Sequence, residues 1–276
     1  MIVTADDFGL SREVNEAVEV AHTRGILSAA SLMVSGAAAG DAIERARRLP
    51  SLRVGLHLVL VDGVPALPRD DIPDLVDDAG CFDDDLGRAG RKIFFDAKAR
   101  QQLTLEIGAQ FDAYKATGLP LDHVNAHHHF HVHPTVGSHL FAIGPRYGMR
   151  ALRVPLEPRA MLNRIERSIS HRRDWQAEPW ARLLRARAKR RGIVTNDRVF
   201  GLAWSGAMSA ERMSALLTNL PAGVTEIYTH PAMTNTFEGA SKQCDYTGDL
   251  AALISSDVVA QLRAIGVRAG GYSDVA

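Results

Sequence analysis

Short apolar runs alternate with amphipathic segments along most of the chain. The apolar runs have strand length and cover residues 2–5, 29–34, 52–58, 123–127, 151–154, 199–204 and 225–230, with a closing run at 267–271. Segments with a helical repeat of apolar positions follow most of them, at residues 11–25, 39–49, 134–148, 209–220 and 249–266. Repeated strand–helix units are typical of a parallel sheet covered by helices. The pattern therefore predicts an α/β fold.

The predicted strands and helices are expected to form one domain. No internal repeat and no linker rich in proline or glycine divides the 276 residues, a length typical of one large α/β barrel. We expect residues 1–276 to form a single irregular (β/α) barrel of the TIM type with about seven strands. In such barrels the active site lies at the C-terminal ends of the strands.

Two segments interrupt the alternation. Residues 59–98 are rich in proline, glycine and aspartate, which predicts an inserted loop over one end of the barrel. Residues 159–191 carry eleven Arg or Lys and three acidic residues, with Trp175, Trp180 and Leu183 among the apolar residues between them. This pattern predicts a basic helical insertion. It is compatible with contact with an anionic membrane surface, with a solvated helical pair, or with a homo-oligomer interface.

Overall charge and cysteine content narrow the classes of partner. The formal net charge is zero and the pI about 7.2, so net charge gives no reason to expect nucleic acid as a partner. The two cysteines, Cys81 and Cys244, lack the CxxC spacing of a zinc finger and fit a reducing compartment. The chain begins in an apolar strand without a charged leader and contains no long apolar run, so we expect a cytoplasmic location.

Histidine is concentrated in the stretch NAHHHFHVHP at residues 125–134. Five of the eleven histidines of the chain lie in seven consecutive positions. If this stretch continues the strand before it, alternate side chains share a face, and His128 points away from the others. The histidines expected on the shared face are His127, His129, His131 and His133. At most two or three of them can bind one metal ion, so other strands must supply further ligands.

The first strand ends in two adjacent carboxylates, Asp6 and Asp7. One acidic residue here would be explained as a helix N-cap, but Ser11 can already cap the helix that follows. Two carboxylates exceed what capping requires. We therefore expect them to contribute to an active site.

Three further strands carry polar residues near their ends. His57 lies in VGLHL, Arg153 in LRVP and His230 in EIYTHPA. Singly, each histidine would be explained as a buried core residue and the arginine as an edge-strand surface residue. Together with the two aspartates they supply one Asp and two His for a catalytic metal site. The remaining Asp, Arg and His form an acid/base pair with an orienting group.

The motifs TADDFG, GLHL, HVNAHHHFHVHP, RVP and THPA occur in this order over nearly the whole chain. In these motifs the chain resembles the YdjC-like carbohydrate deacetylases, which are related to the wider polysaccharide deacetylases. The resemblance implies a (β/α) barrel and one divalent metal ion held by Asp7, His57 and His127, with His129 as the alternative to His127. Such a ligand set suits Zn²⁺, Co²⁺, Mn²⁺ or, less well, Mg²⁺.

The same resemblance implies the roles of the other polar residues. The proton-transfer groups fall on Asp6 as base, Arg153 as its orienting arginine and His230 as acid. We expect His129 and His131 to contact substrate or to support the metal ligands. Trp204, in LAWSG, is expected either to stack on a sugar or to pack in the core.

A finer similarity concerns LRVGLHLVLVDGVPALP, IPDLVDDAGCF and VFGLAWSGAM, which are similar to the hopanoid-biosynthesis-associated branch of the family. It implies a metal-dependent N-deacetylase acting on N-acetylglucosamine of a hopanoid glycolipid, at the inner face of the membrane. The alternatives are deacetylation of soluble chitooligosaccharides such as chitobiose, a metal-dependent hydrolase of another class, and a non-catalytic metal-binding barrel. An amidohydrolase would carry an early HxH strand and a late Asp, so the observed order favours the deacetylase.

Overall fold

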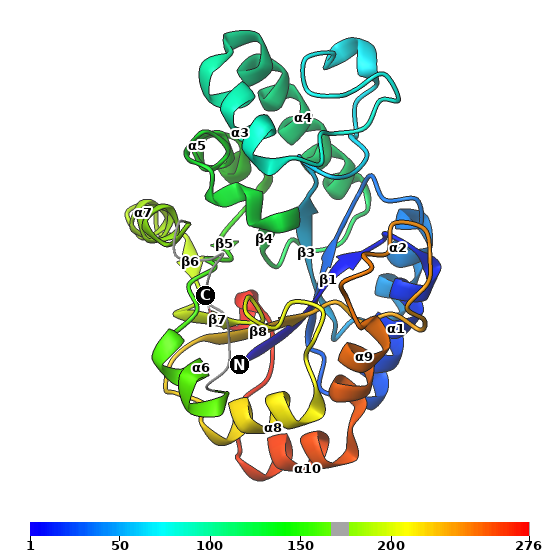
Figure 1. Cartoon of the computed structure of the whole chain (residues 1–276), viewed down its shortest axis with the longest axis vertical. Coiled ribbons are helices and arrows are strands. Elements are labelled where there is room, and N and C mark those ends of the chain that lie inside the picture. The colour runs from blue at the N-terminus through cyan, green and yellow to red at the C-terminus, as the bar shows by residue number, and fades with distance from the viewer. Residues whose placement is uncertain (167–176, 276) are drawn as a thin grey trace.

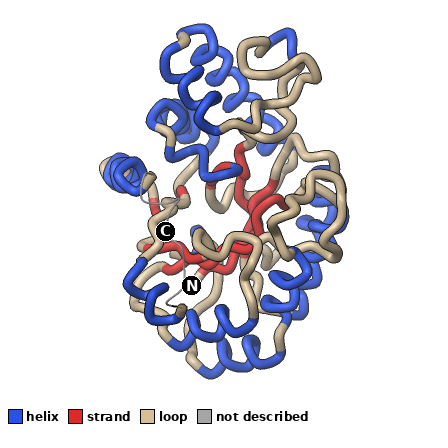
Figure 2. The backbone as a smooth tube through the Cα atoms, viewed as in Figure 1, coloured by secondary structure: helices blue, strands red, loops and turns tan. Residues whose placement is uncertain are grey.

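The structure is a computed structural model that describes residues 1–166 and 177–275. Its strands form one eight-stranded sheet in the order β6-β5-β4-β3-β2-β1-β8-β7, and all the pairs are parallel. The strands are β1 (Ile2–Phe8), β2 (Ala29–Leu32), β3 (Arg53–Leu58), β4 (Val124–Ala126), β5 (Ala151–Leu152), β6 (Val194–Thr195), β7 (Arg198–Phe200) and β8 (Thr225–Thr229). The sheet curls, and the helices lie around its outside (Figures 1 and 2).

The two edge strands of the sheet are consecutive in the chain. Only Asn196 and Asp197 separate β6 from β7, so the curled sheet begins and ends at one short connection. If β6 and β7 are counted as one divided strand, the eight strands become the seven that the sequence pattern predicts. The α/β class and the irregular, barrel-like architecture are thus confirmed.

Helices follow most strands and pack on the sheet. They are α1 (Arg12–Arg24), α2 (Ala39–Arg48), α3 (Leu86–Phe95), α4 (Ala97–Ala116), α5 (Pro134–Ile143), α6 (Arg159–Ile165), α7 (Glu178–Lys189), α8 (Ala210–Thr218), α9 (Tyr246–Ile254) and α10 (Ser256–Ala264). The sequence pattern did not predict α4, and the expected helix at 249–266 is divided because Ser255 has extended backbone angles. No helix in the described parts of the chain is long and apolar enough to cross a membrane.

The closing run at 267–271 is not a strand, contrary to expectation. Its glycines let the chain pass close to other groups, because a Cβ at Gly271 would lie 2.5 Å from both Arg53 Cγ and Asp122 Oδ1. Gly270 N donates to the Met1 carbonyl, so this segment crosses the N-terminal ends of the strands. Close packing there replaces strand pairing.

Helix α1 is capped by its own local sequence, so the two aspartates at the end of β1 are not needed as caps. Ser11 is the N-cap and its hydroxyl accepts from Val14 N, as expected. Val14, Ala17, Val18 and Ala21 repeat with helical spacing and are buried against the sheet. Asp6 and Asp7 are therefore not needed to begin this helix.

The two segments that interrupt the alternation lie at the periphery. Residues 59–98 contain loops, a short 3₁₀ turn, an antiparallel bridge between Val76 and Phe82, and α3. In the other segment, α6 and α7 are helical as expected, whereas residues 167–176, with Trp175, lie outside the described part. Helix α7 buries Leu184 and leaves Trp180 and Leu183 about half exposed.

Candidate active site

A large cavity opens at the C-terminal ends of the strands and has a volume of about 1610 Å³. Segments from four strands contribute candidate polar residues to its wall. These residues are Asp6 and Asp7 of β1, His57 of β3, His127 after β4 and His230 after β8. The inserted segment 59–98 supplies part of the rim through Asp62, Val64, Phe82 and Leu86.

A bulge in β1 brings both adjacent aspartates to the cavity. In a regular strand, neighbouring side chains point to opposite faces. Here the pairing of β1 with β2 shifts register between Ala5 and Phe8, and Asp7 has a left-handed φ of 62°. Aspartate tolerates this conformation better than most residues, although the conformation still stores strain. The bulge therefore allows Asp6 and Asp7 to line one cavity.

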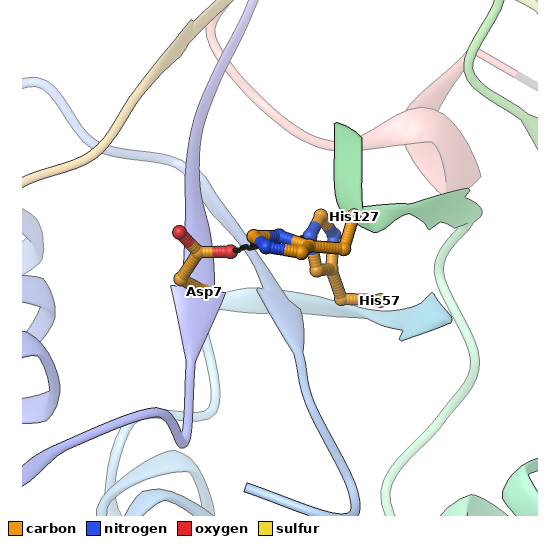
Figure 3. Close-up of side chains that lie close together, drawn as sticks. All are labelled: Asp7, His57 and His127. Carbon is orange, nitrogen blue, oxygen red and sulfur yellow. Dashed lines mark hydrogen bonds and ion pairs between the residues drawn. The ribbon is translucent and has the colours of Figure 1, made fainter. Parts of the chain in front are cut away.

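Three side chains form a compact candidate metal-binding group (Figure 3). Asp7 Oδ1 lies 3.3 Å from His57 Nε2 and 3.1 Å from His127 Nδ1. The three ligand atoms lie within 4.8 Å of one another. Asp7 and His57 are buried, and His127 is partly exposed to the cavity. A carboxylate and two imidazoles are a donor set that divalent transition metals and zinc accept.

The surroundings of His57 show that this group fits a cation. Asn125 Nδ2 donates to Asp6 Oδ1 (3.1 Å) and Ser31 Oγ (2.9 Å), so its Oδ1 is the atom that accepts from His57 Nδ1 at 2.7 Å. With the proton on Nδ1, His57 Nε2 carries a lone pair. That nitrogen is buried, has no hydrogen-bond partner among the described residues, and faces a carboxylate oxygen. Two facing acceptors repel each other unless a cation lies between them.

The histidine-rich stretch does not continue the strand, so the expected alternation of faces is wrong. Strand β4 ends at Ala126 after three residues, and His127–Val132 form a 3₁₀ segment. His128 and His129 inside it have left-handed φ angles of 51° and 53°. This tight turn sends consecutive imidazoles in different directions, which strand periodicity cannot describe.

His128 and His129 meet different partners at the cavity. His128 Nε2 lies 2.9 Å from Asp62 Oδ2, and with His127 these residues form a second, largely exposed candidate group of metal ligands. His129 Nε2 lies 3.2 Å from the Tyr228 hydroxyl. Burial keeps the pKa of His129 well below its usual range, so its ring is neutral at pH 7.

His131 lies outside the cavity wall and is fully buried. Its Nε2 donates to the Arg153 carbonyl at 2.9 Å, and burial lowers its pKa to about 3. A neutral imidazole that binds the backbone of Arg153 supports that strand. The geometry gives His131 no direct contact with a substrate.

Asp6 is held by a buried arginine. Both terminal nitrogens of Arg153 donate to the Asp6 carboxylate, one of them at 3.0 Å, and Arg153 is fully buried. Burial alone would raise the pKa of Asp6, but the attraction of the Arg153 charge outweighs this and holds the pKa well below its usual value. Asp6 is therefore ionised at neutral pH and faces the cavity.

His230 lies at the end of β8, and α9 anchors its backbone. His230 N and Met208 N each donate to the Asp249 carboxylate, at 2.8 and 2.7 Å. The His230 ring packs edge-on against Tyr228, and its Nδ1 has no hydrogen-bond partner among the described residues. His230 lines the cavity, so its ring is placed to exchange a proton with a group bound there.

Trp204 is located in the core below the rim. Its side chain is 3% exposed, Arg212 lies over the ring at 5.4 Å, and its neighbours Ala203 and Ser205, but not Trp204 itself, line the cavity. Of the two expectations for this residue, the position supports core packing, because a buried ring offers no face to a sugar.

Three residues around the site were not predicted from the sequence: Asn125, Glu226 and Asp249. Asn125 stands between His123 and His127 in the histidine motif, at a position where strand alternation directs it inward. Glu226 is a charged residue in the buried run TEIYT, as Arg153 is in its own strand. Two opposite charges in two buried strands were a usable signal for an internal ion pair. Asp249, on a helix, gave no such signal.

The fold and the site define a (β/α)-barrel protein with a candidate metal centre beside an ionised carboxylate and a histidine. Comparison with known families places it more closely: residues 1–264 match the family described as YdjC-like protein, and the chain belongs to that family.

Curated relatives and a solved structure extend this similarity. A protein of Geobacillus stearothermophilus named carbohydrate deacetylase is 28% identical over 99% of this chain and 96% of its own length. One of the same name from Brevibacillus brevis is 38% identical over 136 residues, 49% of this chain and 52% of the relative. A crystal structure from Enterococcus faecalis V583, described as a candidate cellobiose-phosphate cleavage protein, superposes with a TM-score of 0.79 at 24% identity, covering 100% of this chain and 98% of that one. That structural likeness shows the shared fold.

Proposed function

We propose that this protein is a metal-dependent N-deacetylase that removes the acetyl group from an N-acetylglucosamine unit. One observation carries the proposal: adjacent carboxylates share a cavity, and their surroundings differ. Asp7 belongs to a group that fits a cation, whereas Asp6 is not one of its candidate ligands and is ionised beside Arg153. The relatives named carbohydrate deacetylases support the same reaction class.

Asp7, His57 and His127 would hold one divalent ion, namely Zn²⁺, Co²⁺, Mn²⁺ or Mg²⁺. When bound, such an ion lowers the pKa of a water molecule and polarises a carbonyl group. Asn125 contributes by keeping the proton of His57 on Nδ1, which leaves Nε2 available as a ligand.

The proton-transfer steps use Asp6 and His230. The oxygen of water bonds to the acetyl carbonyl carbon, and Asp6 accepts the proton that this water loses. Arg153 orients both oxygens of Asp6 and keeps the carboxylate ionised before the step. As the C–N bond breaks, His230 gives a proton to the nitrogen, and the products are a free amine and acetic acid, which ionises to acetate.

The proposal extends to an N-acetylglucosamine carried by a hopanoid glycolipid at the inner membrane surface. Its support is the similarity of three sequence runs to the hopanoid-associated branch, together with the exposed Trp180 and Leu183 on the basic helix α7. An exposed tryptophan among arginines is typical of contact with anionic lipid headgroups. A chitobiose-type substrate lacks the lipid that such a surface would contact.

Mass spectrometry of candidate substrates tests both levels of the proposal. Metal-loaded protein is incubated with N-acetylglucosamine, chitobiose and an N-acetylglucosaminyl glycolipid. We expect one acetyl group to be lost, and to be lost fastest from the glycolipid. Deacetylation of chitobiose alone would refute the lipid substrate, and an unchanged mass in all three would refute the deacetylase.

Liposome sedimentation tests the membrane contact separately. We expect binding to anionic vesicles and weaker binding by the Trp180→Ala/Leu183→Ala double variant. The matched control is Leu105→Ala, which removes an exposed apolar side chain (55% exposed) from α4. Equal sedimentation of the three proteins would contradict the role of α7.

A further inference from the structure

A C-terminal segment crosses the barrel at the end opposite the cavity. Gly270 N donates to the Met1 carbonyl at the start of β1, and Asp274 pairs with Arg53 at the start of β3 at 2.9 and 3.0 Å. Between these anchors Tyr272 is fully buried. The family match ends at residue 264, so this segment lies beyond it.

The hydroxyl of Tyr272 reaches a carboxylate inside the barrel. It donates to Glu226 Oε2 at 2.6 Å, with Asn196 Oδ1 as a more distant second acceptor at 3.2 Å. Thr4 Oγ1 donates to Glu226 Oε1 at 2.7 Å. Arg153 donates to the same two oxygens, from Nε at 3.0 Å and from Nη2 at 2.7 Å. Glu226 thus accepts four hydrogen bonds, which saturates a carboxylate.

Glu226 and Asp6 bind the same guanidinium from two sides. Arg153 gives Nε and one Nη2 bond to Glu226, and its two terminal nitrogens bond to both oxygens of Asp6. A guanidinium held bidentately on two edges cannot rotate independently of either carboxylate. Displacement of Glu226 is therefore transmitted through Arg153 to Asp6.

Other contacts hold Tyr272 in place. Asp122 Oδ2 accepts from Tyr272 N at 3.0 Å, and Asp122 Oδ1 accepts from Ser273 N at 2.9 Å and from its hydroxyl at 2.6 Å. The Tyr272 ring also lies against His123, with ring centroids 5.1 Å apart. The phenol is thereby aimed at Glu226 by backbone and ring contacts that do not involve its hydroxyl.

We propose that Tyr272 is a positioning residue for the catalytic base, acting through Glu226 and Arg153 on Asp6 from the far end of the barrel. The inference rests on the proposed function, because it takes Asp6 as the base. Without the phenol hydroxyl, Glu226 loses one of its four donors in a dry interior, and the Glu226–Arg153 pair shifts to compensate. The Asp6 carboxylate then moves away from the position in which it receives the proton of water.

The same segment is connected to the metal-binding group by a second path, which meets the first at Asn125, since Asn125 Nδ2 also donates to Asp6 Oδ1 at 3.1 Å. Asp122 binds His123 Nδ1 at 2.8 Å, His123 Nε2 binds Ser31 Oγ at 2.9 Å, and Asn125 joins Ser31 to His57. This path uses the backbone amide of residue 272, which phenylalanine retains. Asn125 keeps its bonds to Ser31 and His57 even if Asp6 shifts, so Tyr272→Phe should disturb Asp6 more than His57.

The test compares Tyr272→Phe with Tyr114→Phe, both in the full chain loaded with Zn²⁺. Tyr114 is a suitable control because it is also buried and its hydroxyl donates to two backbone carbonyls, those of Val54 and Pro120. We expect Tyr272→Phe to lower kcat about 10-fold with KM and Zn²⁺ affinity unchanged, because misplacement of a catalytic group affects the chemical step. Tyr114→Phe should keep kcat, and both variants should lose similar thermal stability.

An NMR measurement tests the coupling of Tyr272 to Arg153 without any enzymatic turnover. The Arg153 Nε–H signal in a ¹⁵N-resolved NMR spectrum should change its shift and exchange faster with water in Tyr272→Phe, but not in Tyr114→Phe. An unchanged Arg153 signal overturns the inference whether or not the protein is active.

Kinetics separates failure of the inference from failure of the proposed function. If wild type turns over, Asp6→Asn does not, and Tyr272→Phe matches Tyr114→Phe in kcat, the inference is wrong and the deacetylase stands. If wild type deacetylates nothing while the Arg153 signal responds to Tyr272→Phe, the proposed function is wrong and the assignment of Asp6 as base, with the positioning role built on it, is overturned as well.

Discussion

Asp6 and Asp7 are chemically identical neighbours in different surroundings, and the proposed function assigns them different tasks for that reason. Asp7 Oδ1 faces two imidazole nitrogens at 3.1 and 3.3 Å. Asp6 faces a guanidinium and an asparagine amide, so each of its oxygens already has donors. The surroundings of Asp7 fit a bound cation, whereas those of Asp6 keep an ionised carboxylate that can accept a proton. Substitutions at the single-residue scale should separate these tasks.

Loss of a ligand should abolish tight metal binding without unfolding the barrel. His57→Ala and Asp7→Asn should each weaken Zn²⁺ binding by at least about 100-fold, a larger effect than loss of a supporting residue. Asparagine is chosen at position 7 because it tolerates the left-handed backbone there. Isothermal titration calorimetry measures the affinity, and His139→Ala on α5, outside the cavity, is the control. Wild-type affinity in either ligand variant would exclude that residue from the metal site.

Loss of the proton-transfer groups should spare the metal. Asp6→Asn and His230→Ala should each lower kcat by about 10²–10⁴-fold while Zn²⁺ affinity stays within a few fold of wild type. Asp6→Asn should stay folded because it removes one of two carboxylates that share the Arg153 charge. Steady-state kinetics with acetate detection makes the measurement. A rate close to wild type in either variant would remove the assigned role.

At the scale of elements, short irregular pieces position the site. The bulge in β1 turns both aspartates inward, the 3₁₀ segment after β4 aims His127, and α9 holds the loop that carries His230. The bulge and the 3₁₀ segment depart from regular geometry at candidate site residues. Regular strands and helices provide the frame, and the irregular pieces determine where the side chains point.

Helix α9 should make stability depend on pH through Asp249. Burial raises the pKa of Asp249 to about 6 in the folded protein, from 3.8. Between these pH values the folded state binds more protons than the unfolded state. The contribution of Asp249 protonation to the free energy of unfolding therefore falls as pH rises, by up to about 1.4 kcal/mol per pH unit, and is gone above pH 6. The free energy of unfolding of wild type relative to Asp249→Asn should therefore decrease from pH 4.5 to 6.

Urea unfolding of chelator-treated protein measures this difference. Asp245→Asn is the matched control on the same helix, because the pKa of exposed Asp245 is lowered by its hydrogen bonds and its titration is complete below this range. A wild-type advantage that is constant from pH 4.5 to 7 would show that Asp249 keeps an ordinary pKa.

At the scale of the whole molecule, metal binding and folding should be linked. The three ligands come from β1, β3 and the segment after β4, so the group exists only in the folded chain. Zn²⁺ at 100 times its dissociation constant should raise the free energy of unfolding by about 2.7 kcal/mol. Thermal unfolding with Zn²⁺ and with EDTA tests this, and Asp7→Asn should show no such difference. An equal Tm for wild type in both conditions would contradict a metal centre at these residues.

The sequence by itself determined the fold class and most of the polar residues that line the cavity. Alternating apolar runs and helical repeats are local patterns, and they specified the parallel sheet because each run must bury its apolar face against another element. Polar residues near strand ends, such as Asp6, His57 and His230, were recognisable because a parallel barrel gathers these ends at one face. The short strands β4 to β7 and helix α4 were harder to predict from the sequence, because tertiary packing rather than a local pattern defines them.

Tertiary structure alone decided how the side chains meet. Strand periodicity predicted shared faces for the histidines. Instead the strand ends at Ala126, His127 meets Asp7, and the left-handed turn at His128 and His129 places His129 beside Tyr228. The Trp204 ring is buried and packs in the core, so it does not stack on a sugar. The path from Tyr272 to Asp6 joins residues 266 positions apart (272 − 6). No local pattern encodes such a contact, because its energy arises only when the curled sheet brings distant charges into one dry interior.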